Sequence, residues 1–438
     1  MVGAASLERP SGARAVARCD LLGVPPYSDL PDMLYRGYLT PAHRAAVDCV
    51  GSWMVEAGMQ VALDPAANLI GRYEGQEPDA PALLIGSHLD SVRDGGRYDG
   101  PLGVMLGIEC VAGLARESRR LPFAIEVVGF GDEEGSRFPA SMLTSRAVAG
   151  TLEPDALAIS DEQGTTLGDA LRGFDASYES VVAGQAICPR EALACSTFAM
   201  AARPPGSVIA YLEAHIEQGP VLEAEGLALG TVTGIAAQLR YRIVVGGVAG
   251  HAGTTSMPLR RDALAAAAEM VLAAERLAAT AASDLVATVG KLEVSPGAAN
   301  VIPGRVVFTL DVRSGLAAAR DAAAAAIIAA CEEIAGRRRV DLDVELIHDL
   351  PPSPCDPRLM ALLDTAIAAE GMPVRRLVSG AGHDAMVMAA VCPTAMLFLR
   401  CEGGVSHNPA ERVAPVDADA ALAVMRRFID SLGEQEGG

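Results

Sequence analysis

The sequence predicts an α/β protein, with a main domain built on a mostly parallel sheet and an inserted ferredoxin-like domain. Short apolar runs such as 83–85 and 123–130 alternate with helical segments, which is the order of βαβ units. Glycines and polar residues follow these runs directly, as they follow buried parallel strands. Residues 240–347 then change to the order β-α-β-β-α-β, typical of a ferredoxin-like domain. We therefore expect a main domain in two parts, 1–228 and 349–438, around an insertion at 229–348.

Length and composition limit the classes of function. A chain of 438 residues is too long for one ordinary core, so two domains are expected. The net charge of -20 disfavours nucleic acid and anionic membrane surfaces as partners. No charge-free apolar run reaches about 18 residues, and residues 1–19 contain no apolar signal segment, so neither a membrane span nor secretion is expected. The nine cysteines are scattered without a CxxC pattern, which suits reduced thiols in the cytoplasm.

Local signals predict the first elements of the main domain. Thr40 and Pro41 match the N-cap and the first residue of a helix that ends before Gly58. Apolar segments then predict a helix at 104–116 and strands at 61–63, 69–73, 83–85 and 123–130.

The first candidate site residues follow the strand at 83–85. His88 and Asp90 come directly after it, and Asp99 comes after a glycine-rich turn, where we expect it to cap the next helix. Ligands bind at this edge of open α/β sheets. A histidine and two carboxylates on flexible backbone at that edge suggest a metal site.

The strand at 123–130 ends in a second acidic segment, with Glu133 and Glu134 between glycines. Taken alone, this segment is equally well explained as a solvated acidic turn. With His88 and Asp99 expected at the same edge of the sheet, a metal site is favoured. Adjacent residues point in different directions, so one carboxylate can bind metal while its neighbour acts on the bound water.

Histidines mark two further segments. Five of the seven histidines lie beside glycines, acids or amides, whereas His43 and His348 look like ordinary surface or edge positions. His215 and Gln218 lie where four polar residues occupy six positions, which favours a liganding role over a structural histidine. His407 follows a glycine pair near the end of the chain.

The inserted domain contributes polar residues of another kind. Arg313 ends a predicted strand, where it is either an edge-strand arginine or a bidentate ligand for a substrate carboxylate. His251 lies among glycines and is equally well explained as a turn residue, and Asn300 is a third polar candidate. Alanine-rich helices expected at 261–278 and 317–337 favour close packing, as across a dimer interface.

Other chemistries lack their motifs. The chain has no GxxxxGK[ST] loop and no GxSxG elbow, and the GxG at Gly380 lacks a dinucleotide-binding context. Cys401 lies near His407, but nothing in the sequence suggests a lowered thiol pKa, so a cysteine nucleophile is rejected.

Mixed nitrogen and oxygen ligands, which Zn²⁺ and Mn²⁺ accept, come from His88, Asp99, Glu134, His215 and His407. A catalytic zinc ion uses about three protein ligands, so five ligands fit two metals that share one carboxylate. Two metals imply a bridging water whose pKa falls from about 15.7 towards 7, which supplies hydroxide at neutral pH.

The motifs resemble those of one family over about residues 40–415. They are GSHLDS, GRYDGPLGV, FGDEEGSRFP, EAHIEQGPVLE, GHAGTTSMPLRRDA, GAANVIPG, DVRS, GAGHDA and SHNPAE. The set resembles the dinuclear-metal amidases that include N-carbamoyl-L-amino-acid hydrolases, β-ureidopropionases of the yeast kind and allantoate amidohydrolases, which are relatives of the zinc carboxypeptidases and aminoacylases. Residues 39–45 and 121–134 are most similar to the bacterial allantoate branch.

The resemblance implies a metallohydrolase catalytic domain with two divalent metal ions, Zn or Mn. It implies that Asp99 bridges them, with His88 and His215 completing one site and Glu134 and His407 the other.

Two further roles follow from the same resemblance. Glu133 is implied to be the general base that takes the proton of the water and later passes it to departing ammonia. Asp90 is implied to orient the metal ligand His88.

The substrate-binding positions implied by the resemblance are Gln218, His251, Asn300, Arg313 and Gly382. Arg313 would bind the substrate carboxylate, while His251 and Asn300 would stabilise the oxyanion, the histidine coming from the partner subunit. The inserted domain would then be the lid and dimerisation domain of a homodimer, and domain closure would assemble the site.

The implied reaction is hydrolysis of a terminal ureido group on a small carboxylate, most similar to allantoate cleavage with release of ammonia and carbon dioxide. The nearest alternative is an N-carbamoyl-L-amino-acid hydrolase or β-ureidopropionase, which needs the same metals, base and arginine. A dipeptidase is disfavoured because His215 stands where peptidase relatives usually carry a carboxylate. A metal-free scaffold is disfavoured because all five ligands and Glu133 are present. Ala214 and the tract 180–206 depart from the family pattern and alter the expected pocket wall.

Overall fold

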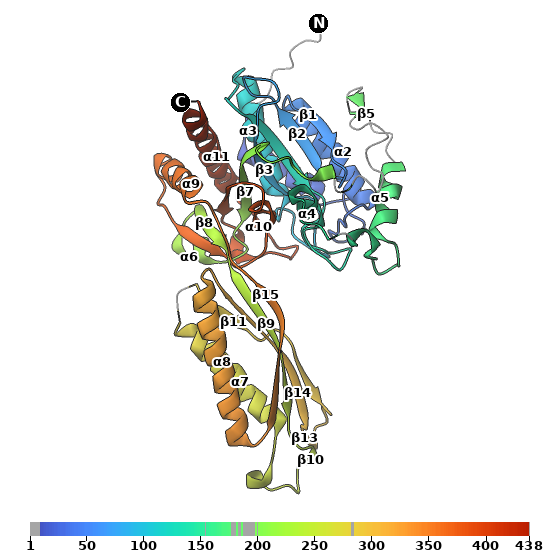
Figure 1. Ribbon diagram of the computed structural model, residues 1–438, viewed down its shortest axis with the longest axis vertical. Helices are drawn as coiled ribbons and strands as arrows, with labels where there is room; N and C mark the ends of the chain where they lie inside the picture. The colour runs from blue at the N-terminus through green and yellow to red at the C-terminus, as the bar shows by residue number, and fades with distance from the viewer. Residues whose placement is uncertain are drawn as a thin grey trace. The chain divides into compact units, whose positions relative to one another are not determined.

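The computed structural model describes residues 9–153, 155–176, 181–182, 185–186, 198, 200–281 and 284–437 (Figure 1). The chain divides into two compact units. Unit 1 comprises Met1–Thr233, Cys355–Leu377 and His383–Gly438, and unit 2 comprises Gly234–Pro354 and Val378–Gly382. Unit 2 begins and ends later than the insertion expected at 229–348, because strand β8 (Leu229–Ile235) starts in the main sheet beside β18.

The largest sheet has nine strands of mixed direction. Its central strands β4, β3, β7 and β18 run parallel, while β1, β2, β8 and β16 pair antiparallel on either side. The α/β class is confirmed, with parallel pairing confined to the centre of the sheet. The spatial order is β1 (Gln60–Leu63), β2 (Leu69–Tyr73), β4 (Ala124–Phe130), β3 (Ala82–His88), β7 (Val208–Ile216), β18 (Thr394–Leu399), β8 and β16 (Ser353–Pro354), with β17 (Arg376–Ser379) paired to β8.

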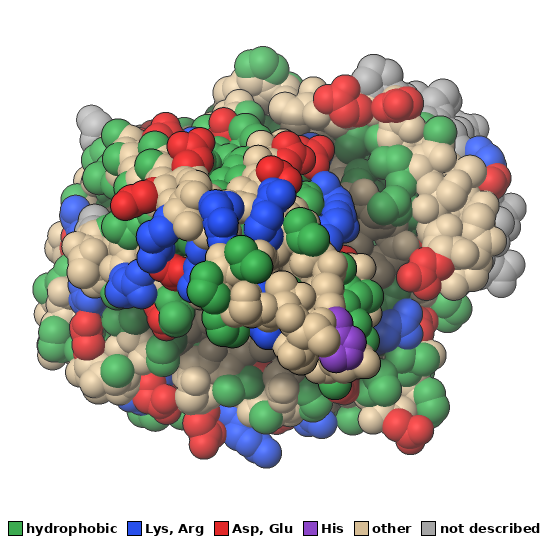
Figure 2. Space-filling view, turned by 90° about the horizontal axis from the view of Figure 1, so that it is seen from below, with side chains coloured by type: hydrophobic (Ala, Val, Ile, Leu, Met, Phe, Trp, Pro, Cys, Tyr) green, Lys and Arg blue, Asp and Glu red, His purple; other side chains and the backbone are tan. Residues whose placement is uncertain are grey.

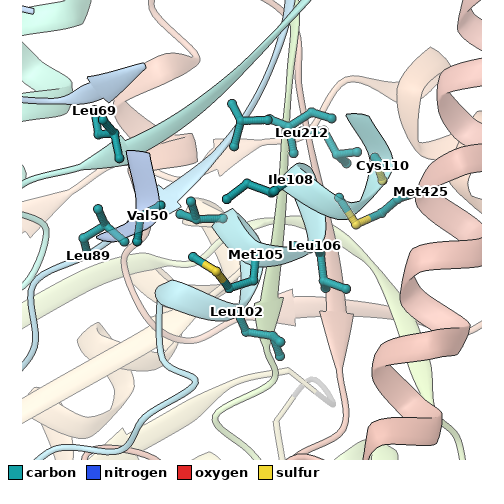
Figure 3. Packing of buried hydrophobic residues seen from close by; sticks show 14 of the residues in the cluster. Val50, Leu69, Leu89, Leu102, Met105, Leu106, Ile108, Cys110, Leu212 and Met425 are labelled. Atoms are coloured by element: carbon teal, nitrogen blue, oxygen red, sulfur yellow. The ribbon is translucent and has the colours of Figure 1, made fainter. Parts of the chain in front are cut away.

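Helix α3 (Pro101–Arg116) packs against the centre of this sheet. Its apolar side chains lie in one core with Val50 of helix α2 and Leu212 of β7 (Figure 3). Gly107 permits the close approach, because a Cβ there would lie 3.0 Å from a methyl carbon of Ile85. Other described helices of unit 1 are α1 (Gly12–Leu22), α2 (Pro41–Glu56), α4 (Leu143–Ala149), α5 (Leu167–Ala176), α6 (Val221–Glu225), α9 (Pro357–Ala369), α10 (Asp384–Met388) and α11 (Pro415–Glu436), and the short strands β5 (Val181–Val182) and β6 (Gln185–Ala186) pair with each other.

Helix α2 begins where the sequence predicts it. The Thr40 hydroxyl accepts a hydrogen bond from the His43 backbone N–H at 3.2 Å, and Pro41 is the first helical residue. His43 itself was expected at the surface, and that prediction is wrong. Its Nδ1 accepts a hydrogen bond from the Leu39 N–H at 3.1 Å, and its ring stacks on Phe174. Because the capping loop folds the start of α2 inward, burial lowers the pKa of His43 to about 3.

Unit 2 has the predicted β-α-β-β-α-β order. Its antiparallel sheet has the spatial order β11-β14-β9-β15, and β12 also pairs with β14, so the strand expected at 285–294 is divided into two. Apolar residues of helices α7 and α8 form the core with one face of the sheet. The elements are β9 (Ala237–Gly246), β10 (Gly250–His251), α7 (Ala263–Ala279), β11 (Val286–Thr288), β12 (Leu292–Ser295), β13 (Val301–Ile302), β14 (Arg305–Ser314), α8 (Ala317–Arg338) and β15 (Asp341–Leu350).

Basic side chains gather on one face of the molecule despite the net charge of -20 (Figure 2). In unit 2, Arg337 and Arg338 at the end of α8 pair with Glu269 of α7. Arg261 pairs with Asp341 at 3.2 Å. These arginines therefore have acidic partners within their own unit.

Candidate metal centre

The site is built at the ends of the four central parallel strands. His88 is the last residue of β3, Glu133 and Glu134 follow β4, and His215 lies near the end of β7. His407 lies in the loop after β18. Because parallel neighbours end at one edge of a sheet, this topology brings together side chains that lie far apart in the sequence.

Asp99 lies between two groups of potential ligands. Its Oδ1 is 3.5 Å from Nε2 of His88 and 3.2 Å from Nε2 of His215, and its Oδ2 is 3.3 Å from Nε2 of His407. The same Nε2 of His407 is 3.4 Å from Oε1 of Glu134. The structure thus brings together all five predicted ligands, in two groups that share one carboxylate. Nitrogen and oxygen donors in this arrangement suit two ions of the Zn²⁺ or Mn²⁺ type.

The buried histidines present Nε2 to the centre because their other nitrogens are held. Nδ1 of His215 lies 2.9 Å from the Ile216 carbonyl, and Nδ1 of His88 lies 3.2 Å from the Asp90 carbonyl. Such contacts fix the ring orientation of metal-binding histidines. Nε2 of His215 is buried and faces Oδ1 of Asp99 at 3.2 Å. The donor set therefore fits metal ions.

Asp90, expected to orient His88, contacts the loop after β4 as well. Its Oδ1 lies 3.3 Å from Nδ1 of His88 and accepts the Glu133 N–H at 3.0 Å, while its Oδ2 accepts the Glu134 N–H at 3.2 Å. One fully buried carboxylate thus connects the end of β3 to the loop after β4. Asp99, in contrast, does not cap α3 as expected, because Gly100 takes the N-cap position and leaves the carboxylate free to face the histidines.

Burial controls the acidity of the carboxylates. It raises the pKa of Glu133 well above the ordinary value, although His88 opposes the shift. It raises the pKa of Glu134 to about 7, again against His88. Asp99 responds in the other direction, since hydrogen bonds from His215, His407 and His88 outweigh its burial and lower its pKa. Added positive charge would favour the ionised form of each buried acid.

The metal-free protein should lose stability as the pH rises from 6.5 to 9. Burial raises the pKa of Glu134 to about 7, and the hydrogen bond to Asp99 raises that of His407 to about 9. A group with a raised folded-state pKa stabilises the fold below its unfolded pKa and loses this contribution as the pH rises through the folded value. Below pH 6.5 the buried, neutral His43 has the opposite effect, because its lowered pKa makes the stability fall as the pH falls. Thermal unfolding after chelation measures the effect, and a Tm that is constant or rising over this range would contradict it.

Gly100 is sterically required beside His88. Its φ is 83°, and a Cβ there would lie 2.5 Å from ring atoms of His88. We expect Gly100→Ala to displace the ring and weaken metal binding by about 10- to 100-fold. Gly164→Ala is the matched control, because Gly164 has a φ of 81° and no described atom within 4 Å of its Cβ position. Both variants carry a backbone cost of about 1–2 kcal/mol. Equal metal affinities in a competition titration would disprove the steric argument.

Sequence reasoning missed two residues of this centre. The Ser406 hydroxyl donates to Oδ2 of Asp99 at 2.7 Å, and Oε1 of Glu411 accepts the backbone N–H groups of Tyr98 and Asp99 at 2.8 and 3.1 Å. Ser406 is next to His407 in the motif SHNPAE, which was the available signal. Glu411 is the last residue of the same motif, but its contact with the Asp99 loop spans more than 300 positions. Gln218, expected to bind substrate, donates its amide N–H to Oδ2 of Asp99 at 2.9 Å.

The other expected substrate-binding residues lie in unit 2, at two ends of its sheet. His251 pairs with Val301 near the end of β9, and the Asn300 carbonyl accepts the Ala252 N–H at 2.9 Å. Arg313 lies beside the start of β9 and donates to the Gly380 carbonyl.

The two ends of that sheet are far apart. Arg305 and Arg313 pair with opposite ends of β9, and eight residues of β-strand extend about 26 Å. Gly382, in the segment after β17, closes unit 2. Within unit 2, the structure therefore does not bring His251 and Arg313 together. The tract 180–206, which departs from the family pattern, lies largely outside the residues that the structure describes.

Comparisons with known proteins match most of the chain. The family model for peptidase family M20/M25/M40 matches residues 84–431. An N-carbamoyl-L-amino acid amidohydrolase of Geobacillus stearothermophilus is 43% identical over 91% of this chain and 93% of its own. A probable allantoate deiminase of Oryza sativa subsp. japonica is 40% identical over 92% of this chain and 85% of its own.

A solved structure agrees over the same length. An amidase of the hydantoinase/carbamoylase family from Burkholderia multivorans has a TM-score of 0.85 and 35% identity, covering 97% of this chain and 98% of that one. None of the helices in the described part of the chain combines the length and hydrophobicity needed to cross a bilayer.

Proposed function

Because the chain belongs to peptidase family M20/M25/M40, as an amidohydrolase of the carbamoylase and allantoate type, we propose that it hydrolyses the terminal ureido group of allantoate. The products are ammonia, carbon dioxide and the ureido acid that remains. The observation that carries the proposal is the position of Asp99 between two ligand groups, with Glu133 in the adjoining loop.

We assign the metal ligands as the sequence implied. His88, Asp99 and His215 would hold one divalent ion, and Asp99, Glu134 and His407 the other. The chemistry that two Zn²⁺ or Mn²⁺ ions supply there is polarisation of the ureido carbonyl and a lowered pKa of water.

Glu133 supplies the proton transfers. A carboxylate next to a metal ligand, held by Asp90 through its backbone N–H, can take a proton from the attacking water and later give it to the departing ammonia. Its buried position supports this assignment, because burial raises the pKa of the acid and so makes the carboxylate a stronger base towards the proton of water.

Recognition of the substrate carboxylate is assigned to Arg313 and that of the oxyanion to His251 and Asn300, with Gln218 and Gly382 as further contacts. The separation of about 26 Å along β14 exceeds the length of a small ureido-carboxylate. A homodimer through unit 2 resolves this difficulty, because His251 and Asn300 of one subunit would then serve the site of its partner.

The second candidate is an N-carbamoyl-L-amino-acid hydrolase, the name carried by the 43% identical relative. The decisive experiment measures ammonia release by the metal-reconstituted protein from allantoate and from a panel of N-carbamoyl amino acids. Higher kcat/KM for allantoate supports the proposal, and preference for N-carbamoyl amino acids replaces it with the second candidate. Inactivity on all of them, in protein shown to contain metal, contradicts both.

A further inference from the structure

A cavity of about 570 Å³ lies on the face of the unit 2 sheet that is turned away from α7 and α8. Three adjacent strands contribute to it. Asp311 of β14 pairs with Thr288 of β11 on one side and with Arg240 of β9 on the other. Because alternate residues of a strand share a face, Thr309 and Arg313 project to the same side as Asp311. The described lining is Arg240, Val286, Thr288, Gly290, Thr309, Asp311, Arg313 and Gly380.

Two guanidinium groups share one carboxylate in this cavity. Oδ1 of Asp311 accepts from Nε of Arg313 at 2.7 Å, and its Oδ2 accepts from Nε and Nη2 of Arg240 at 3.0 and 2.8 Å. Nη1 of Arg313 donates to the Gly380 carbonyl. Nη1 of Arg240 has no partner among the residues that the structure describes. The three side chains together carry one excess positive charge, and an N–H donor of Arg240 remains available.

The cavity is larger than a carboxylate site requires. A water molecule takes about 30 Å³ of liquid volume, so 570 Å³ holds a carboxylate and a substituent beside it. Around the place assigned to the carboxylate at Arg313 lie the Arg240 guanidinium and the hydroxyls of Thr288 and Thr309. Val286 is the one apolar side chain in the described lining.

Resting on the function proposed above, we propose that Arg240 is a specificity-determining residue that binds the second substituent on the carbon bearing the substrate carboxylate. A ureido substituent matches this surface, because its carbonyl accepts from guanidinium and hydroxyl donors while its N–H groups donate to the Asp311 carboxylate or to threonine oxygens. An alkyl side chain would remove water from Arg240 and Asp311 without replacing its hydrogen bonds. The cavity therefore selects allantoate over N-carbamoyl derivatives of apolar amino acids.

The test compares Arg240→Met with a matched variant, Arg242→Met. Arg242 lies two residues along β9, is exposed to a similar degree and faces Glu345 at 3.5 Å outside the cavity lining. Three substrates separate the contributions: allantoate, N-carbamoyl-L-methionine, and N-carbamoylglycine, which has no substituent. We expect Arg240→Met to lower kcat/KM for allantoate by about 10- to 100-fold and to change it for N-carbamoylglycine by less than about threefold. Arg242→Met should leave all three values unchanged.

The possible failures differ from one another. An equal loss of kcat/KM on all three substrates would show that Arg240 only positions Arg313 through Asp311. An unchanged kcat/KM on every substrate would show that Arg240 contributes nothing. Either result overturns the assignment. Retained turnover of N-carbamoylglycine shows that the variant is folded and metal-loaded. If the unmodified protein hydrolyses none of the three, the proposed function itself is wrong, and the role of Arg240 with it.

Discussion

Glu133→Gln should keep both metal ions and lose about 10²- to 10⁴-fold in kcat, the contribution expected of a general acid–base group. The amide has the size of the carboxylate and preserves the backbone N–H that donates to Asp90, so the ligand framework is unchanged. It cannot accept the proton of water. Metal content by elemental analysis and kcat from ammonia release are the two measurements.

Exposed Glu153→Gln controls for the loss of a negative charge and should behave like the unmodified protein. Near-normal turnover of Glu133→Gln would remove Glu133 as the base. Loss of metal along with turnover would instead make it a ligand, consistent with the group that it forms with His88 and Glu134.

Asp99→Asn should remove metal from both positions. It should also lower activity by well over the roughly 100-fold that is typical when a residue that supports a metal ligand is changed. The two oxygens of Asp99 face different histidines, Oδ1 facing His215 and Oδ2 facing His407. An amide keeps one oxygen and places an N–H₂ donor, which cannot ligate, at the other position. The stoichiometry of bound metal should therefore fall from about two to less than one per chain.

Asp94→Asn is the matched control, since Asp94 is exposed in the same loop and has a φ of 56°, which asparagine tolerates. Retention of one full equivalent of metal by Asp99→Asn would show that the two sites do not share this carboxylate. Full retention of metal and activity would end the dinuclear assignment.

Local sequence patterns predicted most elements of both units because the strands are short apolar runs ended by polar turns. The strand at 69–73 and the start of α2 at Pro41 match residue for residue. The antiparallel direction of the outer strands β1, β2 and β8 was not predictable, because their apolar pattern does not show which way a neighbouring strand runs. The burial of His43 was missed because it depends on a loop that folds over the start of its helix.

The ligands were predictable because each lies at or after the carboxyl end of a central strand, at the edge where α/β sheets bind ligands. Ser406 and Glu411 were not, because they act through contacts that only the fold creates. The pairing of Arg240 with Asp311 could not be predicted either, because it depends on the register between β9 and β14. Periodicity shows which residues share a face, but the register decides which of them meet.

The order in which the ligands occur along the chain has a consequence for how the protein matures. His407, the last of them, and Glu411, which holds the loop of Asp99, both lie in the final tenth of the sequence. A ribosome-bound nascent chain therefore lacks the full set of donors until residue 407 has been synthesised. The group of Asp99, Glu134 and His407 can therefore be complete only after β18 has been made, whereas the residues of the group of His88, Asp99 and His215 are all present much earlier.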